Sequence, residues 1–417
     1  MLTTDVLVVG AGPAGTAAAI SLARRGRGVV VIDKASFPRD KCCGDGLTTD
    51  ALRHLETLGM RPSMVDNWNS VTDVIVRGPD GHETHLPLPD AGQYAVVVPR
   101  ADLDSRLVDL ARSAGATVLE STTFNELRME ADRVVVTTSD DEVIQARYVV
   151  AADGMWSPVR KSLGLNPDGY RGEWHAFRQY FSNVGPSAQH LWVWFEPDLL
   201  PGYAWSFPLP GQRANVGFGI ARDGTRRIQD MAALWDDLLD RPHVKAVLGP
   251  EAAPEGRHKA WPIPARVDEM PQVHGRVVFV GDAVAATDPM TGEGIAQALQ
   301  TGIAVADAIA RGGALRPALV GKLYQRSLDD HLVTDHRFAR LLGTALVSPR
   351  RTRAALKIAT LTPWTRRNFA RWMFEDYPRA IVLTPGRWRR GVFSSPGAYR
   401  EAAEAPDTTF DAVGTAS

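Results

Sequence analysis

Short apolar runs and a glycine-rich turn open the chain. Residues 5–9 and 29–32 are continuous apolar runs, and an alanine-rich segment lies between them over 16–25. Strands that are buried on both faces of a parallel sheet have this continuous pattern, whereas half-buried strands alternate. The pattern predicts a strand, a tight turn at 10–15, a helix and a second strand, as at the start of a nucleotide-binding α/β domain.

Elements of the same kind return later in the chain. Helices are predicted over 101–114 and 294–310, and apolar strands over 148–152 and 276–280. The residues between these elements are richer in Trp, Pro and short alternating stretches, which favour an antiparallel sheet. A nucleotide-type domain is therefore expected to be interrupted by a sheet domain and then to resume.

The predicted fold class is α/β, with a Rossmann-type nucleotide-binding domain, an antiparallel-sheet domain inserted into it, and a C-terminal helical region broken at prolines. The residues from 401 onward are small and polar, which is typical of a chain end that frays. The predicted boundaries are 1–65, 99–164 and 266–330 for the discontinuous nucleotide-binding domain, which the motifs below assign to FAD, 66–98 and 165–265 for the inserted sheet domain, which they assign to the substrate, 331–395 for the helical region, and 396–417 for a flexible tail.

The turn at 10–15 reads Gly-Ala-Gly-Pro-Ala-Gly and matches the dinucleotide fingerprint G-x-G-x-x-G. Its glycines permit the tight turn and let backbone N–H groups approach a pyrophosphate at a helix N-terminus. Asp33 ends the second strand, where a carboxylate accepts a hydrogen bond from a ribose hydroxyl. The cofactor-binding residues predicted here are Gly10, Gly12, Pro13, Ala14, Gly15, Asp33 and Lys34.

The stretch 276–302 indicates which dinucleotide binds. A buried strand ends at Gly281–Asp282, and a glycine-rich segment opens the next helix. An acid at a strand end can hold ribitol hydroxyls, and a helix start can direct its N–H dipole at the N1/C2=O edge of a flavin. This stretch resembles the second FAD motif of the para-hydroxybenzoate hydroxylase-like flavoproteins. The resemblance implies FAD and adds Gly281, Asp282, Pro289, Gly292, Gly294 and Ile295 to the predicted cofactor contacts.

Two further stretches resemble the same superfamily. Residues 98–116 contain Arg100, placed to meet the FAD, and residues 152–164 contain the Asp153–Gly154 turn. A second G-x-G-x-x-G does not occur in the sequence. No separate nicotinamide domain is therefore predicted, and NADPH or a reduced electron carrier is expected to act as a transient donor.

Three stretches resemble the geranylgeranyl reductase family, and most closely its bacterial menaquinone and prenyl-lipid reductases. The first has a Lys-x-Cys-Gly run at Lys41, Cys43 and Gly44, the second has a Tyr-x-Trp-x-Phe-Pro motif over 203–208, and the third is 214–220. The resemblance runs from about residue 4 to about 310, and more loosely to about 390. It implies that Cys43 lies near the isoalloxazine ring, so Cys43 and Gly44 join the predicted cofactor contacts.

The resemblance implies an FAD-dependent reductase that saturates C=C bonds of a geranylgeranyl-type lipid or a menaquinone side chain, with hydride from N5 of reduced flavin. An isolated C=C also needs a proton at its other carbon, and Cys43 and Tyr203 are both candidate donors between which the sequence does not choose. Aromatic faces can stabilise the carbocation character that develops. The predicted catalytic residues are Cys43, Tyr203 and Trp205.

Aromatic side chains are concentrated over 174–207. Tyr203, Trp205 and Phe207 alternate along a predicted strand, so a period of two puts all three on one face. Large aromatic surfaces suit an elongated apolar pocket, although the same residues can also form ordinary sheet core. The predicted substrate-pocket residues are Trp192, Trp194, Tyr203, Trp205 and Phe207.

Composition narrows the remaining classes. Hydrophobic residues make up 44% and charged residues 23%, and the formal net charge is −1, which argues against a nucleic-acid binder that works by bulk charge. The two cysteines, Cys42 and Cys43, are adjacent and build neither a disulfide framework nor a four-cysteine zinc site. No metal is predicted. A reducing, cytoplasmic location is expected, because neither a spanning apolar run nor a secretory signal is found.

The segment 336–390 has thirteen Lys and Arg against two Asp and Glu, with Trp and Phe between them. A basic helical region that contains aromatic residues can lie at an anionic membrane interface. The alternative is a packed helical cap with solvated arginines. Peripheral contact with the inner face of the membrane is therefore one interpretation of this segment, and the sequence does not indicate the oligomeric state.

Three other functions share parts of these motifs. An FAD-dependent aromatic monooxygenase or hydroxylase shares the Gly281–Asp282 and Asp153–Gly154 motifs and is the first alternative. A flavin-dependent halogenase needs a lysine beyond the first FAD motif, and none occurs between Lys41 and Lys161. A non-catalytic flavin-binding protein is disfavoured by the Cys-Gly loop beside complete FAD motifs.

Overall fold

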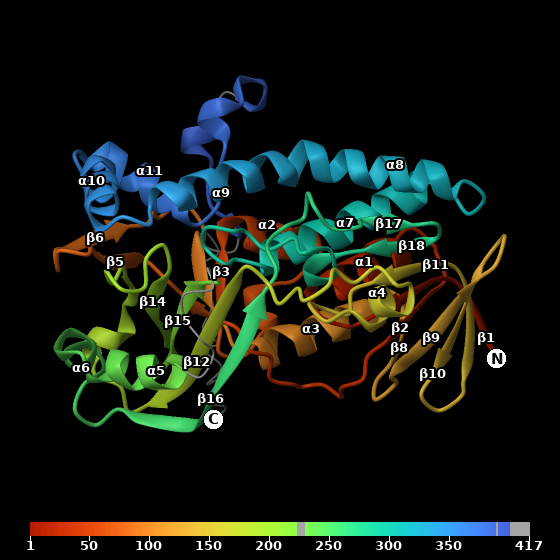
Figure 1. Cartoon of the computed structure of the whole chain (residues 1–417), viewed down its shortest axis with the longest axis horizontal. Coiled ribbons are helices and arrows are strands. Elements are labelled where there is room, and N and C mark those ends of the chain that lie inside the picture. The colour runs from red at the N-terminus through yellow and green to blue at the C-terminus, as the bar shows by residue number, and fades with distance from the viewer. Residues whose placement is uncertain (223–229, 389–390, 401–417) are drawn as a thin grey trace, which may run out of the picture.

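The computed structural model describes residues 1–222, 230–388 and 391–400 of the 417-residue chain. Two large sheets lie side by side, and a layer of helices from the C-terminal part crosses over both (Figure 1). The mixed α/β class predicted from the sequence is confirmed.

The first sheet carries the nucleotide fold. Its strand order is β17-β18-β11-β1-β2-β8, with an antiparallel β9-β10 extension on β11. The pairs along β18-β11-β1-β2-β8 are parallel. The carboxyl ends of β1, β2, β11 and β18 are buried, as the continuous apolar runs predict, whereas β8 at the edge is only partly buried. The bounds are β1 Leu2–Val9, β2 Val29–Ile32, β8 Thr117–Leu119, β9 Phe124–Met129, β10 Val134–Thr138, β11 Val143–Ala151, β17 Val273–His274 and β18 Val277–Phe279.

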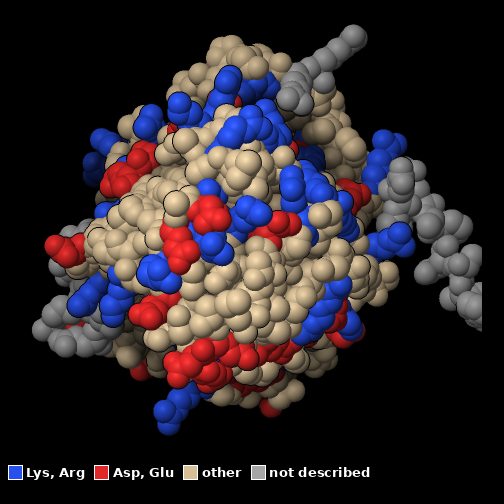
Figure 2. All heavy atoms as spheres, turned by 90° about the vertical axis from the view of Figure 1, so that its right-hand side faces the viewer, with Lys and Arg blue, Asp and Glu red and all other residues tan. Residues whose placement is uncertain are grey.

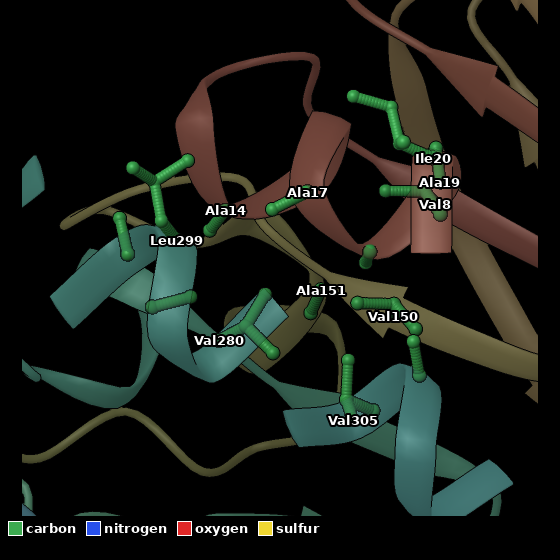
Figure 3. Packing of buried hydrophobic residues seen from close by; sticks show 14 of the residues in the cluster. Val8, Ala14, Ala17, Ala19, Ile20, Val150, Ala151, Val280, Leu299 and Val305 are labelled. Atoms are coloured by element: carbon green, nitrogen blue, oxygen red, sulfur yellow. The ribbon is translucent and has the colours of Figure 1, made fainter. Parts of the chain in front are cut away.

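Helices α1 (Pro13–Ala23) and α7 (Ile295–Gly312) pack on this sheet through small side chains. Ala14 and Ala17 of α1 lie against α7, near Leu299 (Figure 3). A Cβ on Gly302 would be only 2.2 Å from the carbonyl oxygen of Ala14, so the two helices meet almost backbone to backbone. This close approach holds the two FAD motifs, one at the start of each helix, next to each other.

The second sheet is formed by the two segments that were predicted as an inserted substrate domain. Its strand order is β16-β12-β15-β14-β13-β5-β6. All of its pairs are antiparallel except β13 with β5, which is parallel. The prediction of an antiparallel sheet is corrected at that pair, where the two separate insertions meet. The bounds are β5 Asp73–Arg77, β6 Glu83–Pro87, β12 Trp174–Ser182, β13 Leu191–Trp194, β14 Tyr203–Leu209, β15 Arg213–Ala221 and β16 Ala253–Ile263.

Smaller elements connect the two sheets. A three-stranded sheet, β3-β7-β4, stands between them, and α5 and α6 cover the face of the second sheet that carries Trp192 and Trp194. These two helices lie inside the stretch that the sequence assigned to strands. The bounds are β3 Gly46–Thr48, β4 Asn69–Ser70, β7 Ala95–Val97, α2 Thr49–Thr57, α3 Arg100–Ser113, α4 Pro158–Ser162, α5 Asp230–Asp240 and α6 Pro242–Leu248.

The C-terminal helices form the upper layer of Figure 1, where α8 and α9 run as one long, almost continuous element. A five-residue π-helix, Asp329–Val333, joins α8 to α9. Prolines stand at the first turns of α8, α10 and α11, where the missing N–H costs nothing. None of the helices in the described ranges is long and apolar enough to cross a membrane. The bounds are α8 Pro317–Leu328, α9 Thr334–Ala345, α10 Pro349–Ala359 and α11 Pro363–Met373.

The predicted flexible tail at 396–417 is corrected over its first residues. Ala398 forms an isolated bridge with Gln93, and Tyr399 is buried against Trp68 with ring centroids 5.8 Å apart. A buried aromatic anchor and paired backbone hold this part of the chain in place. The rest of the predicted tail, 401–417, lies outside the described residues.

Candidate active site

A cavity of about 900 Å³ extends from the start of α1 to the C-terminal helices. The first FAD motif, the Cys-Gly loop, the second FAD motif, β14 and helices α9 to α11 all contribute to its wall. Most of the predicted cofactor residues line it. They are Gly10, Gly12, Pro13, Ala14, Asp33, Lys34, Cys43, Gly44, Arg100, Asp153, Gly281, Asp282, Gly292, Gly294 and Ile295.

The first FAD motif leaves room for a ligand only at Gly12. Gly10 has a φ of +103°, and a Cβ there would be 2.3 Å from the carbonyl oxygen of Ala152. A Cβ on Gly15 would be 1.8 Å from the carbonyl oxygen of Gly10. A Cβ on Gly12 would meet nothing closer than the Arg39 guanidinium at 3.6 Å. Gly10 and Gly15 therefore form the turn, while Gly12 leaves space for a pyrophosphate.

Asp33 is fixed by the backbone at the end of β2. Its Oδ2 accepts from the N–H of Ala11 at 2.7 Å, and its Oδ1 accepts from the N–H of Ala35 at 2.8 Å. Each oxygen keeps a second lone pair for a ribose hydroxyl. The ribose contact of Asp33 stays a prediction.

Asp153 provides the structural test of whether FAD fits this site. Its Oδ2 accepts from the N–H of Val159 at 2.9 Å, but its Oδ1 is buried with no hydrogen-bond partner in the described part of the chain. Burial raises the pKa of Asp153 to about 6. A buried acceptor on the cavity wall that lacks a donor suits a hydroxyl-bearing cofactor, so the residues present fit FAD.

Glu293 occupies the helix start that was expected to face the flavin. Its Oε1 accepts from the N–H groups of Ile295 and Ala296, both at 2.9 Å. From the sequence, the N–H groups at the start of α7 were expected to face the N1/C2=O edge of the flavin. Two of these N–H groups instead donate to the carboxyl of Glu293. Sequence analysis missed Glu293 because only the two glycines beside it matched the motif.

Asp45 holds the Cys-Gly loop on the second sheet through hydrogen bonds. The Oδ2 of Asp45 accepts from Tyr180 Oη at 2.6 Å and from Asn215 Nδ2 at 2.8 Å. The same Asn215 amide donates to the carbonyl oxygen of Cys43 at 2.9 Å. Burial raises the pKa of Asp45 to about 6 and that of the Cys43 thiol to about 12. Cys43 is therefore a neutral thiol at pH 7, and neither cysteine is in a disulfide.

Tyr203, Trp205 and Phe207 lie on one face of β14, as the alternation predicts, and all three line the cavity. Their neighbouring ring centroids are 5.9 Å apart. The Tyr203 hydroxyl donates to the carbonyl oxygen of Thr291, and Trp205 Nε1 donates to Asn215 Oδ1 at 3.2 Å. The aromatic strip therefore joins the Cys-Gly loop to the second FAD motif.

Trp192 and Trp194 do not line the cavity, which corrects their prediction as pocket residues. The register pairs Val193 with Trp205, so Val193 shares the cavity face. The two tryptophans on either side of Val193 point to the opposite face and pack in the core under α5 and α6. The alternative that the sequence left open, ordinary sheet core, is the observed one for both.

Two predicted cofactor residues also lie off the cavity wall. Gly15 is packed against Gly10, and the carbonyl oxygen of Pro289 accepts from Trp174 Nε1 at 2.9 Å. Arg100 does line the wall, but its guanidinium forms two hydrogen bonds with Asp104, at 2.8 and 2.7 Å. Gly15 and Pro289 therefore shape the site from behind the cavity wall, and the FAD contact of Arg100 stays a prediction.

The C-terminal helices supply a wall that no sequence motif indicated. It is apolar and comes from residues far along the chain from the FAD motifs. Its cavity-lining members include Leu342, Leu346, Leu356, Phe369, Trp372 and Phe374. Elsewhere on the wall, the Lys41 ammonium lies 3.7 Å from the ring centroid of Trp261, and burial lowers the pKa of this lysine.

The fold and the cavity define a flavoprotein of the FAD-binding domain family. The sequence profile of this family matches residues 3–315, and the chain belongs to it. It is an FAD-dependent oxidoreductase, as the sequence motifs predicted.

Characterised relatives are similar over most of the chain. A menaquinone reductase of Mycolicibacterium smegmatis is 32% identical over 368 residues, which cover 83% of this chain and 85% of the relative. A digeranylgeranylglycerophospholipid reductase of Methanopyrus kandleri is 32% identical over 320 residues, covering 72% and 78%. The fold is also that of a geranylgeranyl bacteriochlorophyll reductase-like protein of Thermoplasma acidophilum, with a TM-score of 0.77 at 23% identity over 93% of this chain and 100% of that one.

Proposed function

We propose that this enzyme saturates C=C bonds in the isoprenoid chain of a prenyl quinone or prenyl lipid. The observation that carries the proposal is a single cavity that starts at the FAD motifs and continues between apolar side chains into the C-terminal helices. Two relatives of similar length carry names that specify a menaquinone and a digeranylgeranyl phospholipid as substrates. Of these two substrates we favour a menaquinone side chain, because the menaquinone reductase aligns with a larger share of this chain.

The wall that β13 and the C-terminal helices give to the cavity suits an isoprenoid chain because it is apolar. Leu191, Val193 and Phe195 line it from the sheet, and Leu346 and Leu356 from the helices. Burying each CH₂ of a chain against such a wall contributes about 0.8 kcal/mol. Many weak contacts of this kind can hold a hydrocarbon chain without a polar anchor.

The reacting end of the cavity lies at the Cys-Gly loop. Bound FAD, in its reduced form, supplies the hydride there. Cys43, Tyr203 and Trp205 face the same space from two elements, and the aromatic faces can stabilise positive charge that develops on the alkene. We assign these three side chains to orientation of the reacting bond and to exclusion of water.

We infer that electrons reach the cofactor from NADPH or a reduced carrier that binds transiently. The sequence has no second dinucleotide loop. Lys41 and Lys259 line the cavity, and the side chain of Lys259, which pairs with Asp40, is 49% exposed. Two lysines on the cavity wall suit an anionic donor.

The experiment that tests the proposed function follows flavin absorbance under anaerobic conditions. Holoenzyme reduced with dithionite and freed of the excess is mixed with a menaquinol or a geranylgeranyl lipid in detergent, and the oxidised flavin spectrum is expected to return as the chain is saturated. A matched reaction uses the same compound with a fully saturated side chain, and there the flavin stays reduced. Reoxidation that needs O₂ and an aromatic substrate instead would favour the hydroxylase.

We propose that the C-terminal helices dock on the inner face of an anionic membrane. Large apolar side chains are exposed there, among them Ile358, Leu361 and Trp364, at 64%, 66% and 62%. Arg350 and Arg367 are exposed on the same helices. The far end of the nucleotide domain instead mixes acidic with basic side chains (Figure 2). An apolar surface bordered by arginine, next to the helices that line the cavity, would let substrate pass directly from the bilayer into the cavity.

Removing two basic side chains from this surface is expected to weaken membrane binding. Each Lys or Arg near an anionic surface contributes about 1 kcal/mol, so Arg350→Ser combined with Arg351→Ser should lower the vesicle partition coefficient about 30-fold. Co-sedimentation with vesicles that contain phosphatidylserine measures it. The matched control, Lys322→Ser with Arg326→Ser on α8, should bind like wild type. Equal loss in both pairs would contradict docking through α10.

A further inference from the structure

A cluster of buried ionisable side chains lies behind the cavity wall where α7 begins. Glu293 lines the cavity. Glu375 follows α11, has a side chain only 9% exposed, and is held at a φ of +54°, which L-residues rarely adopt. Arg379 connects the two loops: its Nη2 donates to Glu375 Oε1 at 3.1 Å, and its Nε lies 3.7 Å from Asp288 Oδ2.

The cluster holds more acid than base. Burial raises the pKa of Glu293 and of Glu375, and the charge of Asp288 raises both further while Arg379 lowers them. Three carboxyls therefore face one guanidinium, and at least one carboxyl keeps its proton near neutral pH. The other titratable or polar groups that face members of the cluster include Cys43 of the Cys-Gly loop, Thr48 of β3, Asp50 of α2, Tyr203 of β14, Thr291, Gln297 of α7 and Asp335 of α9.

Gln297 contacts Glu375 from the first turn of α7. The helix begins at Ile295, so Glu293 lies just before it and Gln297 just inside it. Its Nε2 donates to Glu375 Oε1 at 3.1 Å, while its Oε1 is buried without a hydrogen-bond donor among the described residues. Gln297 as a whole is 94% buried, with a relative exposure of 6%. A buried amide oxygen that lacks a donor, beside a protonatable carboxyl, marks a place for a transferable proton.

Glu293 can present its proton to the cavity. Its Oε1 is taken by the N–H groups of Ile295 and Ala296. Within the described ranges, its Oε2 takes part in no hydrogen bond, and the residue forms part of the cavity wall. The proton of the neutral acid therefore belongs on Oε2, in a residue that lines the cavity.

We propose that Glu293 is the acid that protonates the alkene, and that Glu375 is a positioning residue that acts on Glu293 through the charge of Arg379. This inference rests on the proposed function. One C–H bond forms from the hydride of the reduced cofactor, which is oxidised by two electrons. The second C–H bond forms as the O–H bond of Glu293 breaks, the π bond is consumed, and Glu293 is left as a carboxylate until it takes up a proton from water.

Glu293 is a better donor than the two residues that the sequence offered. Burial raises the pKa of the Cys43 thiol to about 12 and that of the Tyr203 hydroxyl well above its usual range. The Tyr203 proton is also engaged by the carbonyl oxygen of Thr291. An acid that titrates near the working pH transfers protons more effectively than one that titrates far above it.

The first test is Glu293→Gln, which keeps the size and polarity of the side chain but removes the transferable proton. With dithionite-reduced holoenzyme and a geranylgeranyl lipid, saturation is expected to slow by at least about 100-fold. Flavin content and reduction by dithionite should match wild type. The control Glu126→Gln removes an exposed carboxyl on β9 and should have no effect.

The second test separates a proton donor from a structural residue by pH. The pKa of Glu293 is raised, so the wild-type rate is highest below it and falls as the pH rises through it. In Glu375→Gln, Arg379 faces one fewer carboxylate and lowers the pKa of Glu293 further. The rate should therefore fall at a lower pH than in wild type. Apoprotein infrared spectra at neutral pH should show the carbonyl stretch of a protonated carboxyl, which Glu293→Gln weakens.

The outcomes distinguish this inference from the proposed function. If wild type saturates the lipid and Glu293→Gln does so at an equal rate, the proton donor is assigned wrongly. An unchanged pH profile in Glu375→Gln would overturn its positioning role, even if Glu293→Gln does not fold. If wild type saturates no prenyl compound, the proposed function fails, and this inference fails with it.

Discussion

Gly12→Ala is expected to give a folded protein that no longer retains FAD. The new methyl group meets nothing closer than 3.6 Å within the protein, and the backbone at φ −75° accepts alanine. The methyl would, however, occupy the approach of a pyrophosphate to the N-terminus of α1. Loss of about two charge-assisted hydrogen bonds costs about 3 kcal/mol, so the dissociation constant of FAD should rise about 100-fold.

Flavin fluorescence titration of the apoprotein measures this affinity, and a thermal melt of the same apoprotein measures folding. Gly10→Ala is the matched comparison, because its Cβ would collide with the carbonyl oxygen of Ala152 and its φ of +103° is strained for alanine. That variant should lose stability as well as FAD. Wild-type FAD affinity in Gly12→Ala would contradict the placement of the pyrophosphate.

Leu356→Trp is expected to block long substrates and spare short ones. Leu356 lines the cavity from α10, on the wall farthest from the FAD motifs. A larger ring there would fill the space that the distal isoprene units need, and overfilling a packed site costs about 1 to 3 kcal/mol. The kcat/KM for a geranylgeranyl substrate should fall at least tenfold, while that for a geranyl substrate stays near wild type.

Product formation from both substrates, measured in detergent, tests this expectation. Ala354→Trp is the matched control, since it adds the same ring to the exposed face of the same helix. Equal losses for the short and the long substrate in Leu356→Trp would mean that the chain does not extend toward α10.

The sequence predicted the parts of the site that depend on local pattern. The tight turn of the first motif needs glycine at positions 10 and 15, and both requirements are visible in the letters alone. The alternation of Tyr203, Trp205 and Phe207 gave their common face because a strand has a period of two. Strand and helix bounds were displaced by a few residues, as at α1, which begins at Pro13 rather than at residue 16.

Other parts of the site depend on contacts between distant segments and could not be predicted in this way. The face of Trp192 and Trp194 is decided by the register of β13 on β14, which period two alone does not specify. The pKa of Glu293 depends on Glu375 and Arg379, which lie more than eighty residues further along the chain. No local motif relates these positions, and only the burial of all three against α7 raises the pKa values of the glutamates.

The central claim is that this flavoprotein reduces isoprenoid double bonds, and the mass of the product tests it most directly. Purified holoenzyme, reduced anaerobically, would be incubated with a menaquinone and separately with a geranylgeranyl lipid. Once any quinol head group has been oxidised back to the quinone, the account predicts a product whose side chain has gained one molecule of hydrogen for each bond saturated, formed without O₂. A substrate that stays unchanged without O₂, together with an aromatic compound that gains one oxygen atom in its presence, would contradict it.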